Sequence, residues 1–161
     1  MVEVSGIDDD VDKGKMDVGK QNFTILLVED NEELLRMTAE ALNKWYKVRR
    51  AHDGMEALDI LAHREVDMIV SDVMMPRMDG TELCRRVKED INYSHIPVIL
   101  LTAKTSVEAK QEGMESGAGV YIEKPFTIHQ LYLQITNLLR MRQQFYERMR
   151  SIDGFAAPAN D

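Results

Sequence analysis

Five short, strand-like runs alternate along this chain with segments whose apolar residues recur at helical spacing. The first run, Phe23–Val28, is apolar except for Thr24, as expected of a strand buried on both faces of a sheet. Further runs follow over 47–51, 67–71, 96–101 and 119–122. Strands that alternate with helices pair in parallel through right-handed crossovers. The pattern predicts an α/β fold, a doubly wound (βα)5 three-layer sandwich of the flavodoxin-like type, with a parallel five-stranded sheet in the order 2-1-3-4-5.

Turn and capping residues mark where the intervening helices begin. Asn31 is placed to cap the first helix, and Asp53-Gly54 and Asp79-Gly80 precede the second and third. A weakly apolar helix is predicted over 105–116, and the last helix begins near Thr127. The first of these helices is expected to bury Leu34, Thr38, Ala41, Leu42 and Trp45 on one side.

The chain divides into three predicted regions. Residues 1–22 have no periodicity and are expected to be a disordered linker or tag, residues 23–140 form the folded domain, and residues 141–161 form a helical extension with a disordered tail. Apolar residues of the last helix fall on heptad a and d positions, with Arg142 interrupting: Ile135, Leu138, Phe145, Met149 and Ile152. Fewer than three heptads leave two interpretations open, a dimerising or signal-relaying helix and a fraying amphipathic tail.

Composition restricts the function classes. The 161 residues carry a formal net charge of −8, which argues against direct binding of a nucleic-acid backbone by this segment. The single cysteine, Cys84, cannot form an internal disulfide and suits a reducing compartment. The sequence has no signal-peptide pattern and no apolar run long enough to cross a membrane. We expect a cytoplasmic segment without membrane contact; a longer parent chain could still be an inner-membrane protein.

Chemically active side chains gather where the strand-like runs stop. Glu29-Asp30, Asp72, Thr102 and Lys124 each follow or end such a run, and the carboxyl ends of parallel strands share one edge. Three crowded carboxylates repel one another unless a hard divalent cation lies among them. A hydroxyl and an ammonium facing that cation suit a phosphoryl group. The pattern therefore predicts an aspartate that carries phosphate, although each residue taken singly also fits a helix cap, a strand end or a solvated lysine.

Four sequence segments together resemble a known family. They are Leu27–Asn31, Ser71–Gly80, Leu101–Lys104 and Glu123–Phe126, which are similar to the four signature segments of a response-regulator receiver domain. The resemblance covers about residues 23–140, and the segments occur in the family's order on the predicted strands.

The resemblance implies a role for each site residue. Asp72 would accept a phosphoryl group from a phosphohistidine on a partner histidine kinase domain. Glu29, Asp30 and Asp72, with the backbone carbonyl of Met74, would hold Mg²⁺ (or Mn²⁺). Thr102 and Lys124 would contact phosphoryl oxygens. The peptide bond before Pro125 is expected to be cis.

The resemblance also implies a switch. Thr102 would move toward the phosphate and the ring of Tyr121 would turn inward, which remodels the face formed by the helix over 105–116, the strand over 119–122 and the last helix. Met74, Ala103 and Lys104 would flank the phosphate and tune its hydrolysis. A homodimer could form through this face or through the extended last helix. The segment Gly117–Val120 lacks the acidic or polar residue found there in many receivers, which leaves the surface around this strand uncertain.

Several functions remain open from sequence. The favoured one is a receiver within a hybrid protein that joins a sensor, a histidine kinase, the receiver and an AraC-type DNA-binding domain, with transcription as output; the alternative is a free-standing phosphorelay receiver. The segment itself would not be an enzyme beyond its own phosphorylation and dephosphorylation.

Three functions from other classes also remain open. One is an aspartate-nucleophile phosphatase, which usually needs a second acid where Met74 stands. Another is an FMN module, which would need a phosphate-binding loop, and the third is a scaffold that is never phosphorylated.

Overall fold

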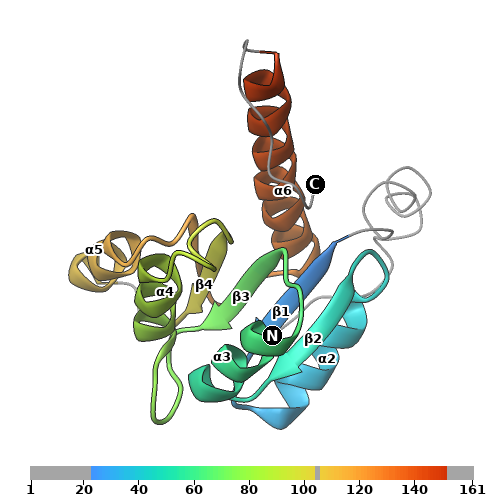
Figure 1. Cartoon of the computed structure of the whole chain (residues 1–161). Helices are drawn as coiled ribbons and strands as arrows, with labels where there is room; N and C mark the ends of the chain where they lie inside the picture. Colours follow the sequence, from blue (N-terminus) through green and yellow to red (C-terminus); the bar gives the residue numbers. More distant parts are fainter. Residues whose placement is uncertain (1–22, 104–105, 152–161) are drawn as a thin grey trace.

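The sheet has the predicted parallel topology. The computed structural model describes residues 23–103 and 106–151, and its sheet has the order β2-β1-β3-β4-β5 (Figure 1). Every neighbouring pair of strands is parallel. The strands are β1 (Thr24–Val28), β2 (Lys47–Ala51), β3 (Met68–Asp72), β4 (Val98–Thr102) and β5 (Val120–Glu123).

Helices cover both faces of this sheet (Figure 1). They are α2 (Glu32–Leu42), α3 (Gly54–His63), α4 (Gly80–Glu89), α5 (Val107–Glu115) and α6 (Ile128–Arg150). At the start of each helix a capping side chain accepts a hydrogen bond from the backbone, as the sequence predicts for Asn31. These caps fix the points where the chain leaves the carboxyl ends of the strands.

The alternation of side chains along the strands divides the core into two layers. Leu27 and Val70 pack with residues of α2 and α6, whereas Leu26 and Ile69 pack with residues of α3 and α4. β3 and β4 are buried along their whole length, as strands in the middle of a doubly wound sheet must be. β2 lies at the edge and exposes three of its five residues, in agreement with its charged sequence.

Two details of the first helix differ from the sequence prediction. Thr38, Ala41 and Leu42 are buried as expected. Leu35 and Ala39 are buried as well, whereas Leu34 is only half-buried, so the buried face of the helix is wider than predicted and does not include Leu34. Trp45 is buried as expected but lies beyond the end of α2. The centroids of the Trp45 and Tyr132 rings are 4.4 Å apart. The helix ends at Leu42, and the turn that follows brings Trp45 back into the core.

The last helix continues without a break past residue 140 to Arg150 and extends beyond the sheet (Figure 1). Arg142 anchors the base of this extension, because its guanidinium donates a hydrogen bond of 3.1 Å to the Asp67 carbonyl ahead of β3. Of the predicted heptad residues, Phe145 is exposed and Ile152 lies outside the described residues. The segments predicted to be disordered, 1–22 and 153–161, also lie outside the described residues. None of the described helices is both long and apolar enough to span a membrane.

We predict that Tyr46→Phe destabilises the fold. The Tyr46 hydroxyl lies 2.6 Å from the Thr136 hydroxyl and links the α2–β2 turn to α6, and burial raises the pKa of Tyr46 to about 12 against the lowering effect of that bond. Removing the hydroxyl leaves a half-buried Thr136 without this partner, which should cost about 1 kcal/mol in urea unfolding. Tyr93→Phe, on the α4–β4 loop, is the control. Equal unfolding free energies for Tyr46→Phe and the parent protein would contradict the prediction.

Candidate phosphorylation site

Three carboxylates meet at the carboxyl edge of the sheet, at the switch point between β1 and β3. Glu29 and Asp30 directly follow β1, and Asp72 is the last residue of β3. Each offers one oxygen, and these oxygens all lie within 4.8 Å of one another. Glu29 and Asp72 are buried, at 7% and 5% exposure, whereas Asp30 is exposed. The topology thus brings Asp72 beside Glu29 and Asp30, which precede it by 43 and 42 residues in the sequence.

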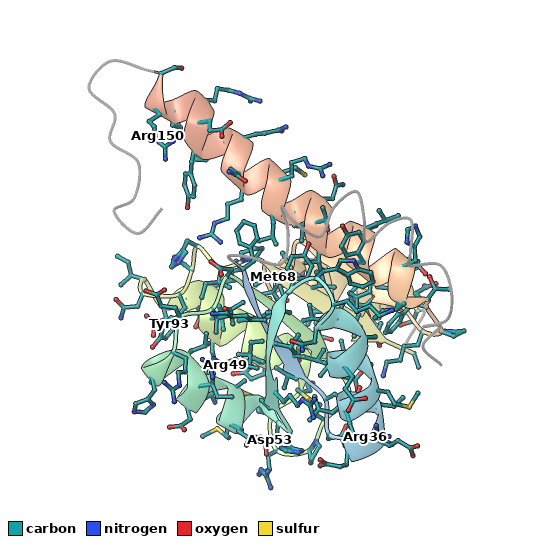
Figure 2. All side chains as sticks on the ribbon, turned by 90° about the vertical axis from the view of Figure 1, so that its right-hand side faces the viewer. Arg36, Arg49, Asp53, Met68, Tyr93 and Arg150 are labelled. Atoms are coloured by element: carbon teal, nitrogen blue, oxygen red, sulfur yellow. The ribbon has the colours of Figure 1, made fainter. Side chains whose placement is uncertain are left out.

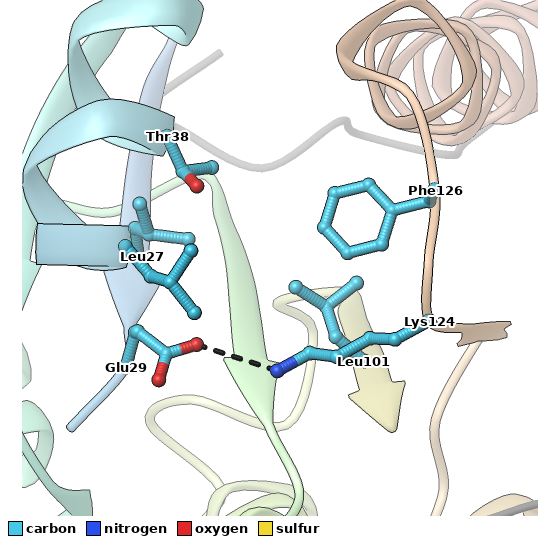
Figure 3. A pocket seen from close by; sticks show the side chains of 7 residues that line it. Leu27, Glu29, Thr38, Leu101, Lys124 and Phe126 are labelled. Atoms are coloured by element: carbon cyan, nitrogen blue, oxygen red, sulfur yellow. Dashed lines mark ion pairs between the residues drawn. The ribbon is translucent and has the colours of Figure 1, made fainter. Parts of the chain in front are cut away.

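Lys124 supplies the positive charge at this cluster. Its ammonium nitrogen lies 2.8 Å from Asp72 Oδ1 and 3.6 Å from Glu29 Oε1, and Figure 3 shows the Glu29 and Lys124 side chains pointing toward each other. Its backbone N–H donates to the Thr102 carbonyl at 2.8 Å, which joins the ends of β4 and β5. The Lys124-Pro125 bond is cis, as the resemblance predicted.

Asn31 holds the first carboxylate in place. The Asn31 backbone N–H donates to Glu29 Oε2 at 3.1 Å, and the same residue's side chain caps α2 by accepting from the Leu34 N–H at 2.9 Å. A hollow beside Glu29 has mostly apolar walls (Figure 3), formed by Leu27, Leu34, Thr38, Leu101 and Phe126 together with Lys124. These walls give one side of the carboxylate a mostly apolar environment.

Burial and crowding make this edge electrostatically costly. Burial raises the pKa of Glu29, and the charge of Asp72 adds to this against the Asn31 hydrogen bond. Burial likewise raises the pKa of Asp72, although Lys124 opposes the shift. Burial alone would lower the pKa of Lys124, but the hydrogen bond and charge of Asp72, with the charge of Glu29, outweigh burial and raise it. Among the described residues, one ammonium, that of Lys124, pairs with two members of this cluster of three carboxylates. An all-oxygen donor set with excess negative charge fits a hard divalent cation such as Mg²⁺ or Mn²⁺.

The other predicted site residues differ in how far they are exposed to solvent. Thr102 is fully buried at the end of β4, in register with Glu123 of β5, and Ala103 beside it is exposed. Met74, two residues after Asp72, is 54% exposed. Lys104 lies outside the described residues.

Tyr121 lies half-buried on β5 with its ring against α5. A Cβ atom added at Gly113 of α5 would stand 2.5 Å from a carbon of the ring, so the absence of a side chain at Gly113 makes room for this tyrosine. Tyr121 also packs against the core layer beneath α3 and α4. The predicted switch residue therefore lies between its strand and α5.

Gly80 is a structural requirement of the site that sequence reasoning missed. A Cβ atom at Gly80 would lie 2.2 Å from the Asp72 carbonyl oxygen, and the Gly80 N–H donates to the Val73 carbonyl at 2.9 Å. The start of α4 thus packs directly on the backbone of Asp72. The dipeptide Asp79-Gly80 indicated only a turn in the sequence, because close approach of two backbones is not visible in a local pattern.

Comparison with known proteins agrees with this geometry. The sequence model of a family described as the response regulator receiver domain matches residues 25–136. The chain belongs to this receiver domain family. Receiver domains are phosphoacceptors of two-component signalling rather than classical enzymes.

Similar receivers occur in proteins of different lengths. Histidine kinase P4 of Formosa agariphila is 45% identical over 125 residues, which cover 78% of this chain and 9% of the kinase. Response regulator MprA of Mycobacterium avium is 39% identical over 117 residues, which cover 72% of this chain and 50% of that protein. The signal receiver domain of a signal transduction histidine kinase from Syntrophus aciditrophicus superimposes with a TM-score of 0.70 at 30% identity, over 84% of this chain and 98% of that one. The chain thus spans at most half the length of these two curated relatives.

We predict that Gly80→Ala destabilises the fold beside the candidate site. Alanine favours helices over glycine by about 1 kcal/mol, but the clash with the Asp72 carbonyl should cost more, within the roughly 1–3 kcal/mol range of overpacked positions. We expect a lower urea midpoint.

The matched control for this substitution is Gly119→Ala. Its added Cβ atom would meet the Leu138 methyl carbons at 3.6 Å, an ordinary contact. If Gly80→Ala proved as stable as Gly119→Ala, the close packing of α4 on Asp72 would not constrain the fold.

Proposed function

We propose that Asp72 accepts a phosphoryl group from a phosphohistidine of a histidine kinase domain. The observation that carries this proposal is the cluster itself, in which Lys124 lies 2.8 Å from Asp72 while Glu29 and Asp30 stand beside it. A carboxylate oxygen of Asp72 attacks the phosphorus atom as the nitrogen–phosphorus bond breaks, and the electron pair of that bond returns to the imidazole. The imidazole nitrogen takes up one proton from water, so the products are an acyl phosphate on Asp72 and a neutral histidine on the kinase.

Each neighbouring residue has a definite part in this transfer. Lys124 already pairs with Asp72. A small movement of its ammonium group would let it pair instead with an oxygen of the phosphoryl group on Asp72. Glu29, Asp30, Asp72 and the Met74 carbonyl would hold Mg²⁺ (or Mn²⁺), and the bound cation would neutralise phosphoryl oxygens. Thr102, at the buried end of β4, would donate its hydroxyl to a phosphoryl oxygen. The chain mainly positions charges, which is what phosphoryl transfer requires.

The output step would pass through α5, β5 and α6. Gly113 is the one buried residue of α5, so this helix contributes little apolar burial and should shift more easily than α2 or α3. We infer that movement of Thr102 toward the phosphate frees space for the Tyr121 ring and so repositions α5. Homodimers would form through this face or through the exposed end of α6.

The parent protein is proposed to be a hybrid of kinase and regulator that controls transcription, with a free-standing phosphorelay receiver as the alternative. The similar receiver within Histidine kinase P4 supports the hybrid arrangement, and the one within the shorter response regulator MprA is an example of a receiver in a protein that is not named a kinase. Because kinases make phosphohistidine from ATP, the receiver would work in the cytoplasm. DNA binding and kinase activity would belong to other domains of the parent.

Acetyl phosphate with Mg²⁺ tests the phosphoacceptor directly. Intact-protein mass spectrometry should show one phosphoryl adduct on the parent protein and none on Asp72→Asn. Asp59→Asn, which removes an exposed carboxylate from α3, should keep the adduct. Sustained release of phosphate without an adduct would instead indicate a phosphatase, and no reaction would indicate a scaffold; either result would overturn the proposal.

A further inference from the structure

A second ion pair lies on the same edge of the sheet as the phosphorylation site but outside it. Arg77, in the loop between β3 and α4, pairs its guanidinium with Asp53 Oδ2. Asp53 directly precedes α3, and Figure 2 shows it at the end of the molecule opposite the protruding end of α6 at Arg150. This loop also carries Met74, whose carbonyl is a proposed ligand of the metal.

The two oxygens of Asp53 serve two different elements. Oδ1 caps α3 by accepting from the Glu56 N–H at 2.8 Å, while Oδ2 faces Arg77. The Asp53 side chain is only 7% exposed, whereas that of Arg77 is 68% exposed. A buried carboxylate needs a charged or hydrogen-bonding partner for each oxygen, so the arginine covers the one that the helix leaves unused.

The backbone of Arg77 also requires an external restraint. Its φ of 66° is the one positive value among the described residues other than glycine, and the Met78 N–H donates to the Pro76 carbonyl across it at 2.7 Å. A three-residue turn with positive φ is strained for a side chain that has a Cβ atom. Such a conformation persists where surrounding contacts determine it.

Met78 provides a second contact between the loop and α3. It is buried, and a Cβ atom at Gly54 would lie 2.7 Å from its sulfur, so the thioether lies directly on the first turn of α3. The loop is therefore held at its ends by the strand and by α4, and in its middle by the start of α3 through Arg77 and Met78.

We propose that Arg77 and Asp53 form a positioning pair that fixes the β3–α4 loop for metal binding and phosphoryl transfer at Asp72, without touching the metal or the phosphate. The inference rests on the proposed function of the site. Without the ion pair, the loop would sample other conformations, and the Met74 carbonyl would lie less often where the three carboxylates can share a cation with it.

The test removes the ion pair from each side separately. Arg77→Asn deletes the guanidinium while asparagine still adopts a positive φ readily, and Asp53→Asn keeps an N-cap for α3 while deleting the charge. Arg77→Lys retains the charge, and Arg86→Ala on the exposed face of α4 controls for the loss of one positive charge.

Two readouts are measured on every variant. Amide hydrogen exchange of the metal-free protein should be faster over residues 73–79 in both asparagine variants. The Mg²⁺ dissociation constant and the rate of Asp72 phosphorylation by acetyl phosphate should each worsen by roughly 10-fold, the low end of the range for residues that support metal ligands. Arg77→Lys should recover part of this loss, Arg86→Ala should match the parent protein, and the double variant should lose no more than either single one.

The outcomes separate this inference from the proposed function. If the parent protein binds Mg²⁺ and is phosphorylated, but the two asparagine variants match it in metal affinity and rate, the positioning role is wrong while the proposed function stands. The same holds if exchange over 73–79 changes without any change at Asp72. If the parent protein itself neither binds Mg²⁺ nor accepts phosphate, the proposed function fails and the positioning role falls with it.

Discussion

Repulsion among three carboxylates at one edge of the sheet is the constraint on which the rest of the structure depends. The acidic oxygens of Glu29, Asp30 and Asp72 stand within 4.8 Å of one another, two of them on buried residues. Burial raises the pKa of Glu29 and of Asp72, which means that ionising them works against folding. Such a cluster is the negatively charged, all-oxygen donor set that a hard divalent cation prefers.

Contacts from the surrounding elements fix the positions of charged residues in this cluster. Asn31 holds Glu29 from the start of α2, Gly80 allows α4 to pack on the backbone of Asp72, and Lys124 is fixed by its own backbone bond to Thr102. Each restraint comes from an element boundary, where a strand ends or a helix begins. The buried strands β3 and β4 provide the rigid base for these boundaries, while α5 buries little and remains the element best suited to move.

Sequence reasoning captured the features that local periodicity encodes. The strand order follows from apolar runs alternating with helices, and the helix starts follow from Asn31, Asp53, Asp79 and Thr127, whose side chains accept bonds from nearby backbone. The gathering of acidic side chains followed from the rule that carboxyl ends of parallel strands share an edge.

Features that depend on tertiary packing could not be predicted in this way. The sequence pattern did not indicate that Leu35 and Ala39 of α2 are also buried, and Trp45 enters the core from a turn whose direction its own sequence does not encode. The ion pair of Arg77 with Asp53 joins residues 24 positions apart, and its importance depends on the burial of the aspartate. The sequence around Gly80 indicates a turn, but only the folded structure places the Asp72 carbonyl where a Cβ atom at Gly80 would clash with it.

Thermal unfolding with and without Mg²⁺ tests the central claim most directly. At pH 7 the cation should relieve the carboxylate repulsion and raise the unfolding temperature of the parent protein, by the equivalent of about 2.7 kcal/mol at roughly 100 times its Kd. The rise should shrink as the pH falls through the raised pKa of Glu29 and Asp72, because protonation then relieves the same repulsion. Asp30→Asn should lose most of the rise. If Mg²⁺ did not change the unfolding temperature of the parent protein, or raised that of Asp30→Asn equally, the result would contradict a cation site at this edge.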